Sequence, residues 1–322
     1  MIRRLLLFAG LAVLALALVT ACGTSSTRHG TVQTTMSPTA ALTGGAPAHI
    51  AVILMENEEY GSIIGSRQTP FINGLASRYA LAKAMYATSH PSLPNYLALT
   101  GGSTFGISSD CTGCSVHAAG LADQLAGAHL SWKAYMEDLP HPCYGGTSAG
   151  EYAKRHDPFM YYIPLRTIPA QCDRVVPLTH LASDEQAHAL PRFIWITPNL
   201  CHDMHDCSTA TGDAFLSRLV PPLLSALGRH GLLFITWDEG TTNDGCCRLA
   251  AGGHIATIVA GPGARAHARM TTPADQYSIL QTIDDLLGLG RLRGAACTCT
   301  PSLSPLLSVG RSAQAAATST SG

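Results

Sequence analysis

The chain has 322 residues, a length that allows either two domains or one large α/β domain. It is 46% hydrophobic and 13% charged, as is typical of a globular protein. Its 20 basic and 21 acidic residues give a net charge of −1, which argues against a basic surface for nucleic acid. The 14 histidines favour metal or acid–base chemistry without locating it.

The N-terminus has the pattern of a secretory signal. Two arginines precede the apolar run 5–19, and a Thr-Ala-Cys sequence ends at Cys22. The run is short for a membrane span, which needs about 20 apolar residues. Small residues before Cys22 resemble a bacterial lipobox, so we expect residues 1–22 to be a lipoprotein signal peptide and Cys22 to carry lipid. The alternative is ordinary cleavage with Cys22 incidental.

Composition then divides the rest of the chain. Residues 23–47 are rich in Thr, Ser, Gly, Ala and Pro and show no hydrophobic periodicity, so we expect a disordered tether. Residues 311–322 look equally disordered. The folded domain is therefore expected over residues 48–310. Within it, residues 138–176 hold many Pro, Gly and aromatic residues and are expected to form an insertion over the site.

Apart from Cys22, ten cysteines remain, an even number that favours disulfides in an exported chain. The short spacings suggest that Cys111 pairs with Cys114 and Cys201 with Cys207. A structural zinc site on Cys111 and Cys114 is the alternative, because their spacing is also typical of zinc ligands.

Two further cysteine pairs lie near the C-terminal end of the domain. Adjacent cysteines seldom have suitable geometry for pairing with each other. We therefore expect Cys246 and Cys247 to bridge to Cys297 and Cys299.

Strand and helix patterns alternate along the folded region. Continuous apolar runs predict buried strands, and apolar residues at helical spacing predict helices. The predicted strands cover residues 49–55, 130–135, 191–197, 231–237 and 254–260. The predicted helices cover 70–80, 95–99, 121–126, 212–229 and 272–287, the last with Thr272 as N-cap. This alternation predicts a doubly wound α/β fold with a mainly parallel central sheet and helices on both faces.

Polar residues follow two of these strands. Glu56 and Asn57 end the first, and Asp238 and Glu239 end the fourth. The carboxyl ends of neighbouring parallel strands converge on one crevice, where ligands bind. Adjacent carboxylates are costly if buried and unpaired, so a cation is a plausible partner for Asp238 and Glu239. Glu56 and Asn57 can ligate a divalent cation, although alone they are better explained as a polar turn.

The densest polar cluster follows the third strand. Its four members lie between two cysteines: His202, Asp203, His205 and Asp206. Only some can point inward, and we favour Asp203 and His205. The alternative is an exposed loop closed by a disulfide.

Ser92 lies in the sequence His90-Pro-Ser-Leu-Pro-Asn95, just before a predicted helix. A serine hydroxyl needs a base or a metal to become a nucleophile at neutral pH. Backbone N–H groups at the helix start can hold a phosphate, and Asn95 can donate to a phosphoryl oxygen. The alternative role for Ser92 is a helix cap.

Three further residues carry weaker signals. His254 follows two glycines that allow the close approach of a ligand, but a lone histidine is more often structural. Lys154 and His156, in the expected insertion, could reach a substrate anion. Solvated surface charge is an equal or better explanation for them.

Taken together, several motifs resemble the bacterial phosphoesterase family that contains secreted acid phosphatases and phospholipases C. They are Met-Glu-Asn, His-Pro-Ser-Leu-Pro-Asn-Tyr, Pro-Asn…Asp-Met-His-Asp, Trp-Asp-Glu-Gly and Gly-Gly-His. The resemblance runs from about His49 to Leu289 and is nearest to the acid phosphatase branch. It implies a fold like that of alkaline phosphatases, with Ser92 as the nucleophile.

The resemblance also implies roles for the other motif residues. The metal would be surrounded by Glu56, Asn57, Asp238 and Glu239. The phosphoryl or leaving group would be held or assisted by His90, Asn95, Asp203, His205 and His254. Two-zinc relatives carry Asp-His in place of Asp238-Glu239 and Asp in place of Glu56. The chain therefore favours one divalent cation, with calcium, magnesium or manganese preferred over zinc.

The sequence thus predicts a metal-dependent, exported acid phosphatase that hydrolyses phosphate monoesters through a phosphoserine, with His205 or His254 as the acid. Its partners would be a phosphate ester, with phospholipids and phosphoinositides among the candidates, and a membrane through the lipid on Cys22. A phospholipase C is the alternative enzyme. A surface lipoprotein that binds a metal or anion without turnover is the alternative of another class.

Overall fold

The computed structural model describes residues 45–248 and 250–309, which lie within one compact unit. The predicted signal peptide with Cys22, most of the predicted tether and the predicted tail lie outside the described residues. Those assignments stay predictions. Within the part of the chain that is described, no helix is both long and apolar enough to cross a bilayer.

The core is a nine-stranded sheet in the order β10-β2-β9-β8-β1-β7-β3-β6, with β11 also paired to β2. Only β9 runs against its neighbours, β8 and β2. The sheet strands are β1 (Ile50–Met55), β2 (Ala80–Tyr86), β3 (Trp132–Met136), β6 (Val175–Pro177), β7 (Phe193–Thr197), β8 (Leu232–Trp237), β9 (His254–Ala260), β10 (Arg269–Met270) and β11 (Ala274–Asp275). A separate hairpin pairs β4 (Ser148–Ala149) with β5 (Tyr152–Ala153).

Strand β1 is the centre of this sheet. All six of its residues are fully buried, which explains its uninterrupted apolar sequence. It pairs in parallel with β7 on one side and β8 on the other, so that Val52 lies between Trp195 and Phe234. The polar residues after β1, β7 and β8 therefore emerge side by side at one edge.

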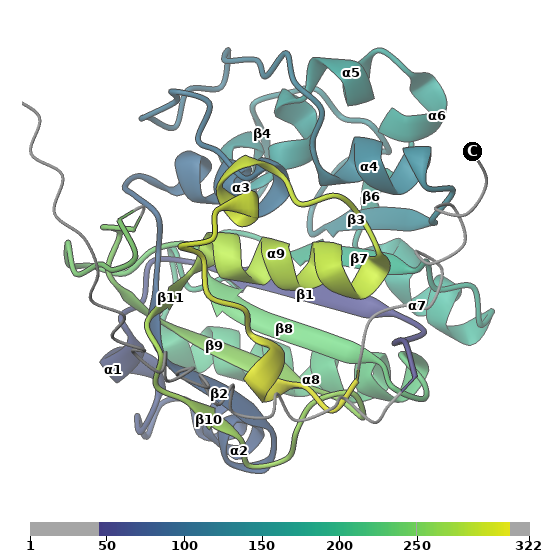
Figure 1. The fold of residues 1–322 in the computed structure, drawn as a ribbon. Helices are drawn as coiled ribbons and strands as arrows, with labels where there is room; N and C mark the ends of the chain where they lie inside the picture. Colours follow the sequence, from purple (N-terminus) through teal and green to yellow (C-terminus); the bar gives the residue numbers. More distant parts are fainter. Residues whose placement is uncertain (1–44, 249, 310–322) are drawn as a thin grey trace, which may run out of the picture. The chain divides into compact units, whose positions relative to one another are not determined.

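Helices cover both faces of the sheet, which confirms the predicted fold class (Figure 1). Helix α9 lies in front of β1 and β8 in Figure 1, in contact with α3, while α8 lies behind them in contact with α2 and α7. The α-helices are α1 (Tyr60–Ile63), α2 (Pro70–Arg78), α3 (Ser92–Gly101), α4 (Leu121–Gly127), α5 (Ile163–Arg166), α6 (Pro169–Cys172), α7 (Thr179–Gln186), α8 (Thr209–Ala226) and α9 (Gln276–Leu287).

Two local predictions were incomplete or wrong. Strand β2 was not predicted, because Lys83 interrupts its apolar run and its first residues continue the pattern of the preceding helix. The N-cap of α9 is Asp275, which exchanges hydrogen bonds with Ser278, and not Thr272. The chain before Asp275 instead pairs with β2 as β11, and this pairing delays the start of the helix.

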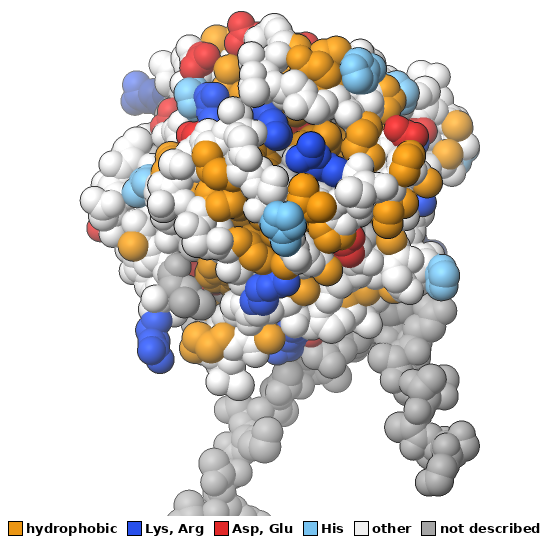
Figure 2. Space-filling view, turned by 90° about the horizontal axis from the view of Figure 1, so that it is seen from above, with side chains coloured by type: hydrophobic (Ala, Val, Ile, Leu, Met, Phe, Trp, Pro, Cys, Tyr) orange, Lys and Arg blue, Asp and Glu red, His pale blue; other side chains and the backbone are white. Residues whose placement is uncertain are grey.

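Residues 138–176 contain the hairpin β4–β5, α5, α6 and the 3₁₀ helices η1 (Lys154–His156) and η2 (Pro158–Tyr161). Figure 2 views the molecule from the side of α4, α5 and α6. On the part of this face that the structure describes, basic and acidic side chains stand apart among hydrophobic ones and form no continuous basic patch.

The cysteines pair locally. The predicted disulfides Cys111–Cys114 and Cys201–Cys207 are confirmed, so Cys111 and Cys114 are not free thiols for zinc. Cys143, which had no predicted partner, pairs with Cys172.

The predicted bridges between the last two cysteine pairs are wrong: Cys246 pairs with Cys247, and Cys297 with Cys299. The 246–250 segment folds back on itself, with hydrogen bonds of 3.1 and 3.2 Å between the backbones of Cys246 and Ala250.

Candidate active site

The strand ends do converge. The Glu56 N–H donates to the Asp203 carbonyl at 2.9 Å, and the Asp238 N–H donates to the Met55 carbonyl at 2.9 Å. Asn57, in the left-handed conformation at φ 55°, turns its N–H to Asp238 Oδ1 at 3.0 Å. Parallel pairing of β7, β1 and β8 thus brings Asp203, Glu56 and Asp238 together, and all three are fully buried.

Ser92 faces this carboxylate group from the start of α3. Its Oγ donates to Glu56 Oε2 at 3.1 Å, and its side chain is buried. One helical turn later, Tyr96 donates its hydroxyl to the other oxygen of Glu56. The next backbone N–H, that of Leu93, donates to Asp110 Oδ1 at 2.9 Å. A carboxylate is therefore placed to accept the proton of Ser92.

His156 completes the group from η1. Its Nε2 lies 3.4 Å from Glu56 Oε2, and its Nδ1 lies 3.4 Å from Asp203 Oδ2. The ring stacks on Tyr96 at 5.4 Å and is buried. Ligand atoms of Glu56, His156 and Asp203 all lie within 4.8 Å of one another, close enough to share one metal ion.

The electrostatics of this group favour a bound cation. Burial, together with the charges of Asp238 and Asp203, raises the pKa of Glu56 well above its usual range. Burial raises the pKa of Asp203 to about 7 and also raises that of Asp238. The pKa of His156 falls to about 3, mainly through burial and then through the charge of Arg155. The protein thus presents a neutral imidazole and carboxylates that are costly to ionise without a counter-charge.

Unpartnered polar atoms support the same conclusion. Of the thirteen buried side-chain atoms without a hydrogen-bond partner among the described residues, four belong to this group: Asn57 Oδ1, His156 Nε2, Asp203 Oδ2 and Asp238 Oδ2. Such atoms are rare in folded proteins because each costs about 1–3 kcal/mol. Carboxylate and amide oxygens with one imidazole form a donor set that suits a hard or borderline divalent cation. The residues present therefore fit a divalent metal.

Glu239 and His90 form a second, adjoining pair. Burial and then the charge of Asp238 raise the pKa of Glu239 to about 9. Its Oε2 lies 2.6 Å from His90 Nδ1, and His90 Nε2 donates to the Thr242 carbonyl at 2.8 Å. The structure therefore directs Glu239 towards His90, whereas sequence reasoning grouped it with the metal ligands.

Asn95 is used within its own turn. Its Oδ1 accepts the Ser89 N–H at 2.8 Å, and its Nδ2 donates to the carbonyls of Ser89 and Pro91 at 2.8 and 3.2 Å. These bonds hold the segment that leads into Ser92. In this arrangement Asn95 positions the serine, and its amide hydrogens do not point to a phosphoryl group.

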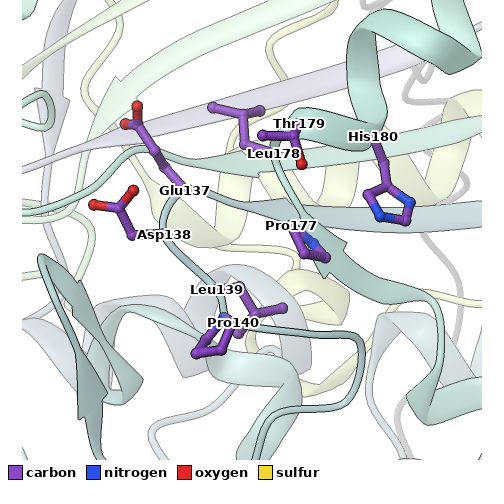
Figure 3. A pocket seen from close by; sticks show the side chains of 8 residues that line it. All are labelled: Glu137, Asp138, Leu139, Pro140, Pro177, Leu178, Thr179 and His180. Carbon is purple, nitrogen blue, oxygen red and sulfur yellow. The ribbon is translucent and has the colours of Figure 1, made fainter.

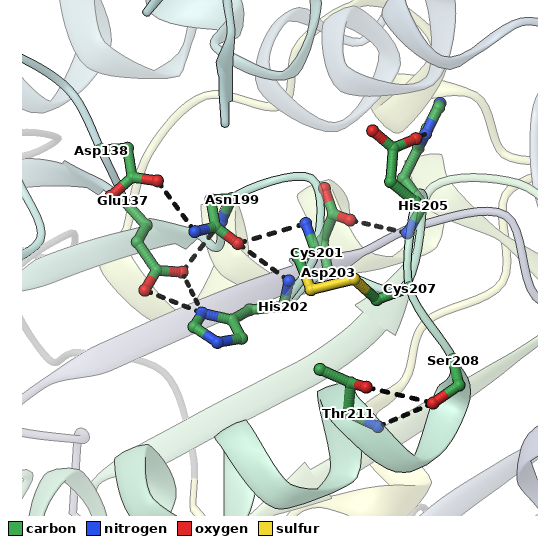
Figure 4. The surroundings of a disulfide bond; sticks show 11 residues. Glu137, Asp138, Asn199, Cys201, His202, Asp203, His205, Cys207, Ser208 and Thr211 are labelled. Atoms are coloured by element: carbon green, nitrogen blue, oxygen red, sulfur yellow. Dashed lines mark hydrogen bonds and ion pairs between the residues drawn. A yellow bond between two sulfur atoms is a disulfide. The ribbon is translucent and has the colours of Figure 1, made fainter. Parts of the chain in front are cut away.

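The 199–207 loop presents Asp203 and His205 and is tied at both ends (Figure 4). Glu137, from the end of β3, accepts the Asn199 N–H at 3.0 Å and pairs with His202 Nδ1 at 2.9 Å. Asp203 Oδ1 accepts the His205 N–H at 2.8 Å. His202 thus points away from Ser92, whereas Asp203 points towards it, in agreement with the preference for Asp203 over His202.

A pocket of about 520 Å³ lies beside this loop, at the ends of β3 and β6 (Figure 3). The carboxylates of Glu137 and Asp138 stand at one end of it and the imidazole of His180 at the other. Its lining includes none of the residues around Ser92. Glu137 therefore belongs both to the wall of this pocket and to the support of the loop.

Comparisons with known proteins identify the family of the chain. A family model described as "Phosphoesterase family" matches residues 66–290, a range that includes Ser92, His156, Asp203, Asp238 and Glu239. A phosphatidylinositol-3-phosphatase of Mycobacterium tuberculosis is 34% identical over 249 residues, which cover 75% of this chain and 77% of that protein. The protein belongs to the phosphoesterase family.

Other members of the phosphoesterase family are similar over shorter shares of their length. The phosphate-repressible acid phosphatase of Penicillium chrysogenum is 28% identical over 70% of this chain, which spans 58% of that protein. The acid phosphatase of Aspergillus fumigatus is 29% identical over 64% of this chain, which spans 48% of it. Relatives with these names identify the chain as a phosphoric ester hydrolase.

Solved structures show the same fold at low identity. A protein of the alkaline phosphatase superfamily from Vibrio parahaemolyticus superposes with a TM-score of 0.56 at 13% identity, over 80% of this chain and 71% of that one. The lipoteichoic acid synthase of Listeria monocytogenes superposes with a TM-score of 0.52 at 10% identity, over 77% and 74% of the two chains. These likenesses support the fold.

Two of the predicted site residues of this phosphoesterase lie apart from the buried group. His254 stacks between Tyr60 and Tyr86, at ring distances of 4.5 and 5.1 Å, and its Nε2 donates to the Lys83 carbonyl at 2.9 Å. The glycine before it, at φ +97°, allows close contact with the backbone of Gly240 and not with a ligand.

Lys154 is buried and engaged elsewhere. Its Nζ donates to the Thr112 carbonyl at 2.8 Å and lies 4.9 Å from the centre of the Tyr161 ring. It therefore ties η1 to the loop closed by the Cys111–Cys114 disulfide.

Sequence reasoning missed three residues that the structure places at the site: Tyr96, Asp110 and Arg155. Tyr96 could have been found, because it lies four residues after Ser92 and so shares its helix face. Asp110 lies in a loop and Arg155 in the short 3₁₀ helix η1, and their approach to Ser92 depends on tertiary contacts that no local pattern reveals.

Proposed function

We propose that the protein is a metal-dependent phosphomonoesterase of the acid phosphatase type that acts through a phosphoserine at Ser92. The observation that carries this proposal is the 3.1 Å hydrogen bond from Ser92 Oγ to Glu56 Oε2, a buried carboxylate whose other close neighbours are His156 and Asp203. A helix cap would not need this buried partner. A nucleophile requires one to remove its proton.

The residues support a two-step reaction. In the first step, Ser92 Oγ forms a bond to phosphorus while the bond to the ester oxygen breaks, and the serine proton moves towards Glu56. The leaving alkoxide takes a proton from an acid. His205 is the better candidate, because its Nδ1 is fixed at 2.6 Å from Asp206 Oδ1 and its ring lies 5.6 Å from that of His156. In the second step, water gives a proton to His205 and its oxygen forms a bond to phosphorus while the bond to Ser92 Oγ breaks; inorganic phosphate leaves, and Oγ recovers its proton from Glu56.

A divalent cation would be held by Glu56, Asp203 and His156, with oxygens of Asn57 and Asp238 beside them. When bound, it would lower the pKa of the Ser92 hydroxyl and neutralise charge on the phosphoryl oxygens. The oxygen-rich donor set favours magnesium, manganese or calcium. Because imidazole is also a zinc ligand, zinc is included among the cations to be tested.

The relative from Mycobacterium tuberculosis suggests a substrate class. Its name gives phosphatidylinositol 3-phosphate as a substrate, which is a phosphate monoester on a lipid headgroup. We propose phosphoinositide monoesters as substrates beside soluble monoesters. Export, with a lipid on Cys22 and the folded domain over residues 48–310, remains part of this proposal and places the enzyme at the cell surface.

The test compares release of p-nitrophenol from its phosphate monoester and from its phosphorylcholine diester, with and without chelator. The Ser92→Ala variant should lose turnover while its melting temperature stays near that of the wild type. Ser217→Ala, which removes a hydroxyl bonded to the Ala214 carbonyl within α8, is the matched control. Acid quenching followed by mass spectrometry should find phosphate on the peptide that carries Ser92.

The results of these assays distinguish a phosphatase, a phospholipase C and a binding lipoprotein. Chelator-sensitive turnover of the monoester alone supports the phosphatase, whereas preferred turnover of the diester supports a phospholipase C. Absence of turnover of either substrate, across pH and added cations, favours a binding lipoprotein. Full activity in Ser92→Ala rejects the nucleophile assignment even if the enzyme is a phosphatase.

A further inference from the structure

Arg155 places a guanidinium group at the edge of the carboxylate-rich site. It lies in η1, directly before the buried His156, and its side chain is 27% exposed. Its Nη2 lies 3.3 Å from His205 Nε2, and its Nε lies 3.8 Å from Asp110 Oδ2. The guanidinium group therefore reaches both solvent and the surroundings of Ser92.

The partners of Arg155 locate it relative to the reacting hydroxyl. Asp110 uses its other oxygen to accept the Leu93 N–H, the peptide group that follows Ser92. His205 belongs to the same short loop as Asp203. Arg155 is thus linked to the nucleophile through Asp110 and to the buried carboxylates through His205.

The charge of the site requires a group of this kind. A phosphate monoester brings up to two negative charges into a site that holds four buried carboxylates and has a fifth, Asp110, at its edge. Lys154, the neighbouring cation, is already committed to a carbonyl and an aromatic ring. Among the described residues, Arg155 is a cation near Ser92 whose donors are not taken up by a close carboxylate pair.

The contacts of Arg155 are also loose enough to be exchanged. The distance of 3.8 Å between Arg155 Nε and Asp110 Oδ2 is longer than a hydrogen bond. The contact with His205 uses only Nη2 among the three guanidinium nitrogens. A guanidinium group has five N–H donors in a planar arrangement that matches two phosphoryl oxygens at once. Turning to a phosphoryl group would release His205 Nε2, which could then take a proton from solvent and pass it to the leaving oxygen.

We propose that Arg155 binds the phosphoryl oxygens of the substrate on the side away from Glu56. This inference rests on the proposed function, because it concerns the same site. It predicts that the guanidinium group contributes to binding of any phosphate monoester and of the product, inorganic phosphate, whatever alcohol the substrate carries.

The test measures inhibition by inorganic phosphate, together with KM and kcat for p-nitrophenyl phosphate, in Arg155→Gln and Arg155→Lys. One bidentate, ionic hydrogen-bonded contact corresponds to about 10- to 100-fold in affinity. We expect the inhibition constant and KM to rise together by that factor in Arg155→Gln and less in Arg155→Lys. Added guanidinium ion at millimolar concentration should partly restore Arg155→Gln.

Two further variants serve as controls. Arg291→Gln removes a comparably exposed arginine that pairs with Asp285 at 2.7 and 2.9 Å, and it should leave both constants unchanged. Asp110→Asn keeps an acceptor for the Leu93 N–H but removes the charge beside Arg155. If Arg155 only anchored the loop of Asp110, this variant would reproduce the loss seen in Arg155→Gln. We expect it instead to bind phosphate more tightly than the wild type, because it removes a negative charge beside Arg155.

The inference and the proposed function fail in different ways. Wild-type turnover with an inhibition constant in Arg155→Gln within twofold of the wild-type value would overturn the role of Arg155 and leave the phosphatase standing. A wild-type protein without turnover would remove the proposed function. Calorimetric titration with inorganic phosphate would then still test Arg155, because equal binding by wild type and Arg155→Gln would reject it.

Discussion

Replacing Asp203 with Asn should make the metal-free protein more stable at pH 8. The Asp203 carboxylate is fully buried, and its Oδ2 has no hydrogen-bond partner among the described residues. Burial raises its pKa from 3.8 to about 7. An Asn side chain has almost the same shape, keeps an acceptor for the His205 N–H and carries no charge that burial would penalise.

The sign and size of the effect follow from the pKa. Between pH 3.8 and about 7 the folded state binds a proton at Asp203 more tightly than the unfolded state, so the free energy of unfolding falls as pH rises. The full rise corresponds to about 4 kcal/mol. Nearby carboxylates share this cost, so we expect a gain of about 2 kcal/mol in Asp203→Asn at pH 8, and little gain at pH 4. For a domain of this size the gain is about 4–8 °C in melting temperature.

Thermal unfolding in chelator at pH 4 and pH 8, and then with added magnesium, manganese, calcium or zinc, measures both consequences. A cation that binds the wild type should raise its melting temperature at pH 8, because it stabilises the folded state alone. The same cation should stabilise Asp203→Asn much less. The reasoning is refuted if the chelated variant is less stable than the wild type at pH 8, or if both proteins gain equally from the cation.

Three further variants test the supports of the site. Glu137→Ala removes the carboxylate that holds the 199–207 loop. We expect cation binding, measured by thermal titration, to become about tenfold weaker. An unchanged affinity would mean that the disulfide alone holds the loop. Replacing Cys201 and Cys207 by Ser should cost about 2 kcal/mol in chemical denaturation, and no loss would show that the bridge adds no constraint. His254→Ala should lower the melting temperature by several degrees while kcat stays within about threefold, whereas a 100-fold fall in kcat would restore His254 as the acid.

The sequence is enough to locate the centre of the site. An uninterrupted apolar run such as β1 is typical of a strand buried on both faces, and a polar residue at its end is then expected at the carboxyl edge of the sheet. Because β1, β7 and β8 are adjacent and parallel, Glu56, Asp203 and Asp238 meet as expected. Backbone geometry alone explains this success.

The sequence could not determine which atoms meet. Glu239 follows Asp238 directly, yet its carboxylate pairs with His90. His156 was expected at the surface as readily as over the site, but it is buried between Glu56 and Asp203. These outcomes depend on how the 138–176 segment packs over the strand ends, and no periodicity in that segment encodes its packing.

The same limit explains the errors in the cysteine pairs and in the α9 cap. A preference against adjacent disulfides is an average, and the Cys246–Cys247 bridge, in a segment whose backbone folds back to Ala250, is an exception to it. Thr272 followed by Pro273 has the pattern of a helix start, but pairing of β11 with β2 holds the chain extended until Asp275. In both places a contact between distant or folded-back segments outweighs local preference.

Buried carboxylates and unpartnered polar atoms are concentrated at the carboxyl ends of β1, β7 and β8, which favours a ligand there. Within β1, β7 and β8 the buried side chains are apolar or hydrogen-bonded, apart from the indole N–H of Trp237 at the end of β8, which has no partner among the described residues. At their carboxyl ends, the buried carboxylates of Glu56, Asp203 and Asp238 lie together, and polar atoms around them lack partners. A protein that folded without a cation would lose stability at this point for no benefit. Stabilisation of the folded state by a divalent cation, and its loss in Asp203→Asn, would therefore identify what offsets that cost.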